Sequence, residues 1–241
     1  MEFSTNIEMR RGDKIFLSSF AFIENCSKLR LQEVESALHT IEYQRYESFN
    51  SDVRKASFLL GRYCAKKAIA SLYNIESLNQ IYIDSGIFNQ PVIKLPNIPN
   101  MRVSISHDGV SAVALAFPEE HPMGIDIESI DEDKISEVST HFTVHEKTLY
   151  HGMDNSKTEI DTILWTAKES LSKALKTGLT TGLDIMELGT LEKVNQRYFR
   201  GTFTHFFQYQ TISIIHGSKV ITLLLPRKSI VELDENSNLF N

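Results

Sequence analysis

The chain has 241 residues, 41% of them hydrophobic and 23% charged, which is the balance of one large folded domain or of two small ones. Its formal net charge of −6 excludes the broad basic surface that binds nucleic acids or anionic membranes. No apolar run reaches the about 18 residues of a membrane span, and the segment from Met1 to Lys14 is too charged for a signal peptide. Two distant cysteines, Cys26 and Cys64, suit a reducing compartment, so we expect a cytoplasmic protein without nucleic-acid or membrane partners.

The first half of the chain predicts a strand followed by two helices. Residues 15–23 are an apolar run of strand length, and residues 32–49 place apolar side chains at helical spacing. Asp52 is a suitable N-cap for a second helix that runs to about Tyr73. Within about a third of its circumference this helix carries four basic side chains, Arg54, Lys55, Arg62 and Lys66. Such a face is usually solvated, but it also suits a phosphate-binding edge, and both interpretations stay open.

Residues 101–117 predict a β-hairpin with its turn at Asp108. Alternation along the first strand puts Ser104 and Ser106 on one face and His107 on the other. His107 falls at the strand end, where a side chain can reach a ligand. A turn histidine bonded to nearby backbone is the alternative.

The polar segment 118–122 carries two prolines and predicts a boundary between two subdomains, 1–117 and 118–241. The second subdomain opens with a strand on which Asp126 and Glu128 point the same way, about 6.6 Å apart. Two carboxylates on one face repel unless a cation lies between them, and hard oxygen ligands of this kind suit Mg²⁺. The alternative is an edge strand whose charged residues face solvent.

A helix that ends near Gly178 follows. Its apolar side chains form one stripe, made of Ile160, Ile163, Leu164, Ala167, Leu171, Ala174 and Leu175. Trp165, Glu169 and Lys173 lie at i, i+4 and i+8 on roughly the opposite side. A tryptophan is unusual on the polar side of a helix, but this stretch alone suits a functional face and a surface Glu–Lys pair of about 0.2–0.5 kcal/mol equally well. The acidic strand motif and the Ser106-His107 turn elsewhere in the chain favour the functional face. Residues 199–225 then predict a meander of strands.

Three motifs, taken together and in order, resemble the 4′-phosphopantetheinyl transferases of the Sfp type. They are Ser104-Ile105-Ser106-His107, Gly124-Ile125-Asp126-Ile127-Glu128, and Trp165 with the Lys168-Glu169-Ser170 triplet and Lys173. The Lys-Glu-Ser form of the third motif, with Ala174-Leu175 after Lys173, is similar to bacterial members that serve siderophore synthesis and other secondary metabolism. Each motif is weak alone, and the three in this order are specific.

The resemblance implies an α+β fold of two similar subdomains, each a small antiparallel sheet with a long helix, related by a pseudo-twofold. It implies an enzyme that moves the 4′-phosphopantetheine arm of coenzyme A onto a serine of an apo carrier protein, acyl, peptidyl or aryl, and releases 3′,5′-ADP. Coenzyme A would bind to the N-terminal subdomain and lie in a cleft between the halves, with the metal site and the catalytic helix in the C-terminal one. We expect a monomer.

The resemblance also assigns roles to single residues. Asp126, Glu128 and Glu169 would bind Mg²⁺, or Mn²⁺ in its place. Glu169, or a metal-bound water beside it, would take the serine proton, and Lys173 would stabilise the charge on the leaving phosphate. Five further residues would hold coenzyme A, namely Lys168 at the pyrophosphate, Ser106 and His107 at its phosphates, and Arg54 and Arg62 at the 3′-phosphate.

Two positions depart from the family pattern. Gln90 stands where the family often has a lysine that helps to hold coenzyme A, and Asp108 stands where it usually has Ser or Asn. Two other functions therefore stay open. One is a metal-dependent nucleotide phosphohydrolase that uses the same carboxylates, and the other is a non-catalytic relative that only binds carrier proteins.

Overall fold

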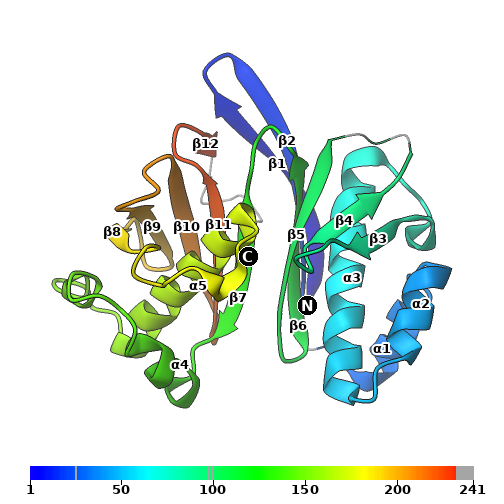
Figure 1. The fold of residues 1–241 in the computed structure, drawn as a ribbon, viewed down its shortest axis with the longest axis horizontal. Helices are drawn as coiled ribbons and strands as arrows, with labels where there is room; N and C mark the ends of the chain where they lie inside the picture. Colours follow the sequence, from blue (N-terminus) through cyan, green and yellow to red (C-terminus); the bar gives the residue numbers. More distant parts are fainter. Residues whose placement is uncertain (25, 97, 99, 232–241) are drawn as a thin grey trace. The chain divides into compact units, whose positions relative to one another are not determined.

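The computed structural model describes residues 1–24, 26–96, 98 and 100–231, which form two compact units (Figure 1). Unit 1 comprises residues 1–122 and the segment that begins at Ser229, and unit 2 comprises Met123–Lys228. The described end of the chain, expected in the second subdomain, groups with unit 1 because β12 (Ile230–Val231) pairs with β1 (Glu2–Arg11). None of the helices formed by these residues is both long and apolar enough to cross a membrane.

Unit 1 is built on a five-stranded antiparallel sheet with the order β12-β1-β2-β6-β5 and a separate two-stranded sheet, β3-β4. Its other strands are β2 (Lys14–Ile23), β3 (Tyr82–Ser85), β4 (Pro91–Lys94), β5 (Met101–Asp108) and β6 (Ser111–Pro118). Its helices are α1 (Lys28–Glu35), α2 (Thr40–Glu47), α3 (Asp52–Tyr73) and the short 3₁₀ helix η1 (Leu78–Gln80).

Two features of unit 1 differ from the sequence prediction. The single helix expected over residues 32–49 is two helices. The side chain of His39 caps the start of α2, and the Glu42 carboxylate accepts a hydrogen bond from the His39 amide. This capping box starts a new helix instead of continuing the first. Strand β1 was not predicted, although Ile7 and Met9 alternate with charged residues and are buried.

Unit 2 is a five-stranded antiparallel sheet with the order β7-β11-β10-β9-β8. Its strands are β7 (Gly124–Ser129), β8 (Leu188–Lys193), β9 (Tyr198–Phe203), β10 (Tyr209–His216) and β11 (Lys219–Pro226). Its helices are α4 (Glu132–Ser139), η2 (Glu146–Thr148), α5 (Lys157–Leu175) and η3 (Gly178–Thr180). Helix α5 ends slightly earlier than predicted, at Lys176 in the left-handed conformation.

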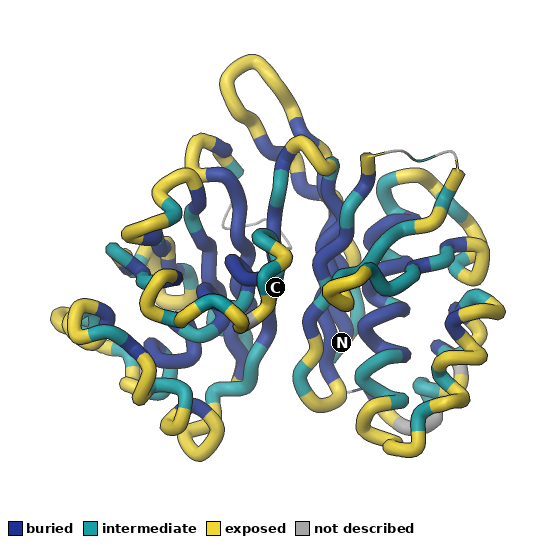
Figure 2. The backbone as a smooth tube through the Cα atoms, in the orientation of Figure 1, coloured by how far each residue is buried: buried dark blue, intermediate teal, exposed yellow. Residues whose placement is uncertain are grey.

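The expected α+β class is confirmed, and each unit combines an antiparallel sheet with one long helix. The order β2-β6-β5 in unit 1 matches β7-β11-β10 in unit 2, counting from the strand that precedes the helices of each unit. Helix α3 contacts β2, β5 and β6, and helix α5 contacts β7, β10 and β11. Helix α5 is buried along most of its length, and α3 is buried mainly between Leu59 and Ala70 (Figure 2).

Helix α5 buries more than its predicted apolar stripe. Ile163, Leu164 and Leu171 are fully buried, as the periodicity predicts. Thr162, Thr166, Ser170 and Ser172 on other sides of the helix are also at most 2% exposed. The hydroxyls of Thr166 and Ser170 bond to backbone carbonyls one turn earlier, which satisfies them inside the core. The side opposite the stripe is therefore not a solvated surface.

Gly124 brings strand β7 into direct contact with the backbone of α5. A Cβ atom at this position would lie 2.0 Å from the carbonyl oxygen of Ser170. The position thus excludes every residue except glycine, which gives the glycine of the Gly-Ile-Asp-Ile-Glu motif a structural reason.

We expect Gly124→Ala to lower the free energy of unfolding by about 1–3 kcal/mol, because backbone must shift to admit the methyl group. Urea denaturation measures this change. Gly61→Ala in α3 is the matched control, since its Cβ would meet only the Ile105 side chain, at 3.0 Å. That variant should lose less stability than Gly124→Ala, because a side chain can move more easily than backbone and alanine favours a helix over glycine. Equal effects of the two substitutions would contradict this account.

Candidate functional site

Strand β7 presents Asp126 to helix α5. Asp126 pairs in register with Thr222 of β11, so the two side chains share one face of the sheet. The Thr222 hydroxyl lies 2.6 Å from that of Thr166 in α5, which identifies this as the face that α5 covers. Asp126 is 2% exposed, and the side chain of Glu128 is 18% exposed. Strand β7 is an edge strand of its sheet, as the alternative expected, but its carboxylates do not face solvent.

Two lysines from different helices pair with these carboxylates. The ammonium of Lys173, in the last turns of α5, lies 2.6 Å from Asp126 Oδ1 and also donates to the carbonyl oxygen of Ile125 at 3.2 Å. Lys134 of α4, which the sequence analysis did not single out, pairs with Glu128. Positive charge thus stands beside both carboxylates of the strand.

Glu169 of α5 belongs to the same electrostatic cluster. Burial raises its pKa to about 7, with a further contribution from the charge of Asp126 and a smaller one from Glu128. Lys173 opposes this rise. A carboxyl group with a pKa near neutrality can both accept and release a proton at physiological pH, as a general base or acid must. Glu169 of the helix therefore interacts electrostatically with the two carboxylates of the strand.

The donor set suits a hard divalent cation, because Asp126, Glu128 and Glu169 offer only carboxylate oxygens. Among the residues that the structure describes, no three His, Cys, Asp or Glu side chains converge into a preformed metal site. The donor chemistry fits Mg²⁺, whereas the present arrangement holds lysines against two of the three carboxylates. A bound cation would have to displace or share these ammonium groups.

Lys168 does not occupy the position that the resemblance predicted for it. Its side chain is fully buried, and its ammonium lies 2.6 Å from Glu146 Oε1. The same ammonium donates to the carbonyl oxygens of Leu183, at 2.7 Å, and Met186, at 3.3 Å. An ammonium with three partners inside unit 2 cannot contact a pyrophosphate, so this assignment is corrected to a structural one.

The basic face predicted for α3 is also largely internal. Lys66 is fully buried and pairs with Glu42, which is 2% exposed. Arg62 is 9% exposed and lies 3.4 Å from the same carboxylate. Arg62 is therefore held inside unit 1 rather than offered to a 3′-phosphate. Only the N-terminal part of this face fits the prediction, because Arg54 is exposed and lies over the ring of Phe49.

Ser106 and His107 lie at the end of β5 and point to opposite faces of its sheet, both as predicted. Ser106 is buried and His107 is exposed. His107 pairs with Ala112, whose carbonyl oxygen accepts from the thiol of Cys64 in the middle of α3. Arg54 is ten residues earlier on that helix, about 15 Å away along its axis, so His107 and Arg54 are not brought together.

Gln90, the first departure from the family pattern, closes the turn between β3 and β4. Its side-chain oxygen accepts from the amide of Phe88 at 2.9 Å, and its backbone oxygen accepts from the amide of Gly86. Gln90 therefore orders this turn and leaves the neighbouring Ile87 and Phe88 side chains exposed.

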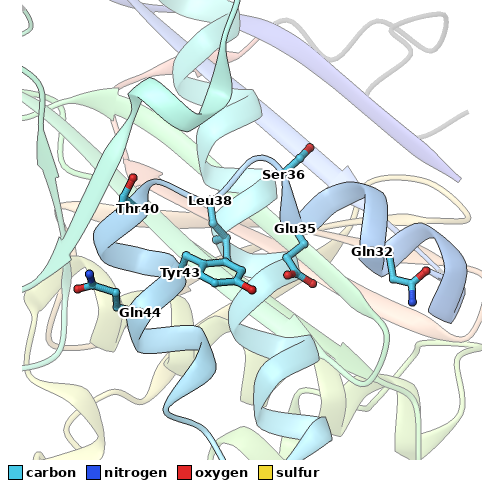
Figure 3. A pocket seen from close by; sticks show the side chains of 7 residues that line it. All are labelled: Gln32, Glu35, Ser36, Leu38, Thr40, Tyr43 and Gln44. Carbon is cyan, nitrogen blue, oxygen red and sulfur yellow. The ribbon is translucent and has the colours of Figure 1, made fainter.

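A separate hollow of about 800 Å³ lies at α1, α2 and the turn that joins them (Figure 3). Glu35, Leu38 and Tyr43 line it, together with four polar residues. The charged residue of this lining is the acidic Glu35, and the charges of Glu47 and Glu35 raise the pKa of the Tyr43 hydroxyl. The hollow contains none of the predicted site residues and does not suit a phosphate.

The family match falls almost entirely within unit 2. Residues 122–224 match the model of the 4′-phosphopantetheinyl transferase superfamily. The holo-[acyl-carrier-protein] synthase of Lactococcus lactis subsp. cremoris is 30% identical over 122 residues, which cover 48% of this chain and 93% of that protein. The synthase of the same name from Mycoplasma mycoides is 31% identical over 93 residues, which cover 38% of this chain and 83% of that protein. The chain therefore belongs to this superfamily and is a phosphopantetheinyl transferase.

We expect Glu169→Gln to be more stable than the wild type at pH 8, with a gain that shrinks as the pH falls from about 7 to 4.5. The reason is that the folded protein holds the Glu169 proton more tightly than the unfolded chain does. Ionisation of Glu169 in the folded state therefore costs stability above its pKa, and below pH 4.5 the carboxyl is neutral in both states. Melting curves of both proteins at several pH values measure the difference. A variant that is less stable than the wild type at pH 8 would contradict this assignment.

Proposed function

We propose that the protein transfers 4′-phosphopantetheine from coenzyme A to a serine of an apo carrier protein and releases 3′,5′-ADP. The observation that carries the proposal is the joint position of Asp126, Glu169 and Lys173, from a strand and a helix that lie within the residues matched by the family. The holo-acyl-carrier-protein synthases that match the chain support the acceptor class.

In the proposed reaction the serine oxygen attacks the phosphorus that bears the pantetheine arm, and the bond from that phosphorus to the bridging oxygen breaks. Glu169 is the general base that the chain supplies, and it accepts the serine proton. Lys173 stands by Asp126 and can neutralise charge on the departing 3′,5′-ADP. The chain thus supplies a base and a cation, and the rest of the work is positioning and charge neutralisation.

Mg²⁺, or Mn²⁺ in its place, is the metal that this donor set would take, with Asp126, Glu128 and Glu169 as its protein ligands. When bound, the metal neutralises charge on the pyrophosphate. Asp126 is the ligand with the most fixed position, because it is 2% exposed and held by Lys173. Glu128 is held by Lys134, which is half exposed and therefore the more easily displaced partner.

For coenzyme A we retain Ser106, His107 and Arg54 of unit 1 as candidate phosphate ligands and remove Arg62 and Lys168. We further propose that this enzyme is of the Sfp-like type that the motifs resemble, in which one chain carries two similar units. The shared strand order of the units supports this, as does the coverage of the Lactococcus protein, 93% of which corresponds to 48% of this chain. Acyl and peptidyl carrier domains are both acceptors to be tested.

The test is incubation with coenzyme A, Mg²⁺ and purified apo carrier domains, followed by mass spectrometry of the carriers. We expect the mass of one phosphopantetheine to be added to at least one carrier, and EDTA to stop the reaction. Asp126→Ala should lower the rate by about 100-fold or more, because it removes both a ligand and the partner of Lys173. Full transfer in EDTA would exclude the metal role.

The same experiment separates the two alternatives. A phosphohydrolase would release product from a nucleotide without any carrier. A binding-only relative would form a complex with apo carriers and leave their mass unchanged. Either result would overturn the proposed transfer.

Lys134→Met should bind Mg²⁺ more tightly than the wild type. The ammonium of Lys134 competes for Glu128, and its removal also increases the local negative charge. An exposed ion pair contributes roughly 0.2–1 kcal/mol, so we expect the dissociation constant to fall by up to about fivefold in isothermal titration calorimetry. Lys157→Met, which breaks the pair with Asp161 elsewhere in unit 2, is the control. Weaker binding by the Lys134 variant would show that this lysine does not compete with the metal.

A further inference from the structure

We propose that the buried Glu146–Lys168 pair is a positioning device for the catalytic helix, which fixes the rotation of α5 about its axis so that Glu169 and Lys173 face strand β7. This inference rests on the proposed function of these two residues. Neither member of the pair can touch a substrate, because both side chains are fully buried.

The pair joins four segments of unit 2 at one point. Glu146 accepts from the amide of Thr143 at 3.0 Å and from the amide of Leu188, the first residue of β8, at 2.9 Å. Lys168 lies 2.6 Å from Glu146, and its other two donors go to the carbonyl oxygens of Leu183 and Met186. The ammonium protons of Lys168 are thus all used, and α5 is tied to the loop before η2, to residues 183–186 and to the edge strand.

The hydrogen bonds of Lys168 determine the direction in which the following residue, Glu169, points. Successive helical residues are rotated by about 100°, so a Lys168 held against Glu146 places Glu169 on the adjacent side of α5. Lys173 follows Glu169 by four residues and shares that side, where it meets Asp126 at 2.6 Å. A rotation of α5 that released Lys168 would therefore turn both residues away from the strand.

The apolar stripe alone does not set this rotation sharply, because α5 is buried on nearly every side. Two further contacts constrain α5: the hydroxyl of Thr166 lies 2.6 Å from that of Thr222 in β11, and the close approach of Gly124 to the backbone of Ser170 limits the separation of helix and strand. The ion pair on one flank and the glycine contact on the other enclose the side of α5 that carries Glu169. Misplacement of a catalytic group by about 1 Å can cost a hundredfold in rate.

Unit 1 contains a counterpart that serves as a matched control. Its helix α3 carries Tyr63-Cys64-Ala65-Lys66-Lys67, which parallels Trp165-Thr166-Ala167-Lys168-Glu169 of α5. Lys66 is fully buried and pairs with Glu42, which accepts from the amide of His39 at 2.9 Å and from that of Ile83 at 3.1 Å. The residue after Lys66 is Lys67, so the Glu42–Lys66 pair fixes helix α3 in place but positions no carboxylate beside it.

The experiment compares Lys168→Met and Lys66→Met in the full chain, each assayed well below its own melting temperature. Both variants should melt lower than the wild type, because each loses a buried ammonium. Lys168→Met should reduce kcat about 10- to 100-fold with the KM for coenzyme A within twofold. Lys66→Met should keep kcat within twofold. Glu146→Gln, which leaves Lys168 its two carbonyl partners, should reproduce the loss of kcat to a smaller extent.

Trp165 gives a readout that does not depend on activity. It is the only tryptophan of the chain and lies one turn before Glu169 on α5. Lys168→Met and Glu146→Gln should shift its fluorescence maximum and change its quenching by acrylamide, whereas Lys66→Met should leave both unchanged. This comparison tests the helix even if the wild type transfers nothing to any carrier, a result that would overturn the proposed function alone.

Several outcomes would overturn the positioning role. Unchanged Trp165 fluorescence in both unit 2 variants would show that packing alone holds the helix. Equal losses of kcat in Lys66→Met and Lys168→Met would show a general effect of stability. Failure of both unit 2 variants to fold while Lys66→Met folds would make the pair a determinant of folding instead.

Discussion

The structure of the site depends on how closely helix α5 approaches strand β7. Gly124 allows the strand to touch the backbone of α5 at Ser170, and no side chain could be accommodated there. Because the two elements are so close, Asp126 of the strand and Lys173 of the helix meet at 2.6 Å. Water is largely excluded from Asp126, so charges at this place interact strongly. The reactivity of the site is thus a consequence of backbone packing.

This proximity creates an electrostatic conflict that lysines only partly relieve. Burial, together with the charges of Asp126 and Glu128, raises the pKa of Glu169 to about 7. Lys173 and Lys134 compensate Asp126 and Glu128. A site that is costly to assemble without ligand is common where charge must be stabilised during a reaction. Binding of a divalent cation would relieve the same conflict.

Both units contain a buried lysine–glutamate pair that holds the long helix, but only in unit 2 does the pair stand next to a candidate catalytic residue. In each, a buried lysine of the long helix pairs with a buried glutamate that also accepts from two backbone amides, as Lys66 does with Glu42 and Lys168 with Glu146. A buried charge pair tolerates little misalignment, because each member needs all its bonds to offset desolvation. Only in unit 2 does a carboxylate follow the lysine, and only unit 2 matches the family model.

Local patterns in the sequence predicted a helix that ends near Gly178, with Glu169 and Lys173 on one side of it, and a strand on which Asp126 and Glu128 point the same way. The α+β class and the joining of these residues in one site came from the resemblance of the motifs to a known family. The sequence did not determine which charged residues are internal. Lys168 and Arg62 were predicted to bind phosphates, yet each is held by a glutamate more than 15 residues away in the chain. The Thr143-x-x-Glu146 spacing of a capping box was the one local signal for Glu146. Only the tertiary structure decided the rest, since the desolvation of a charge depends on neighbours that the fold brings together.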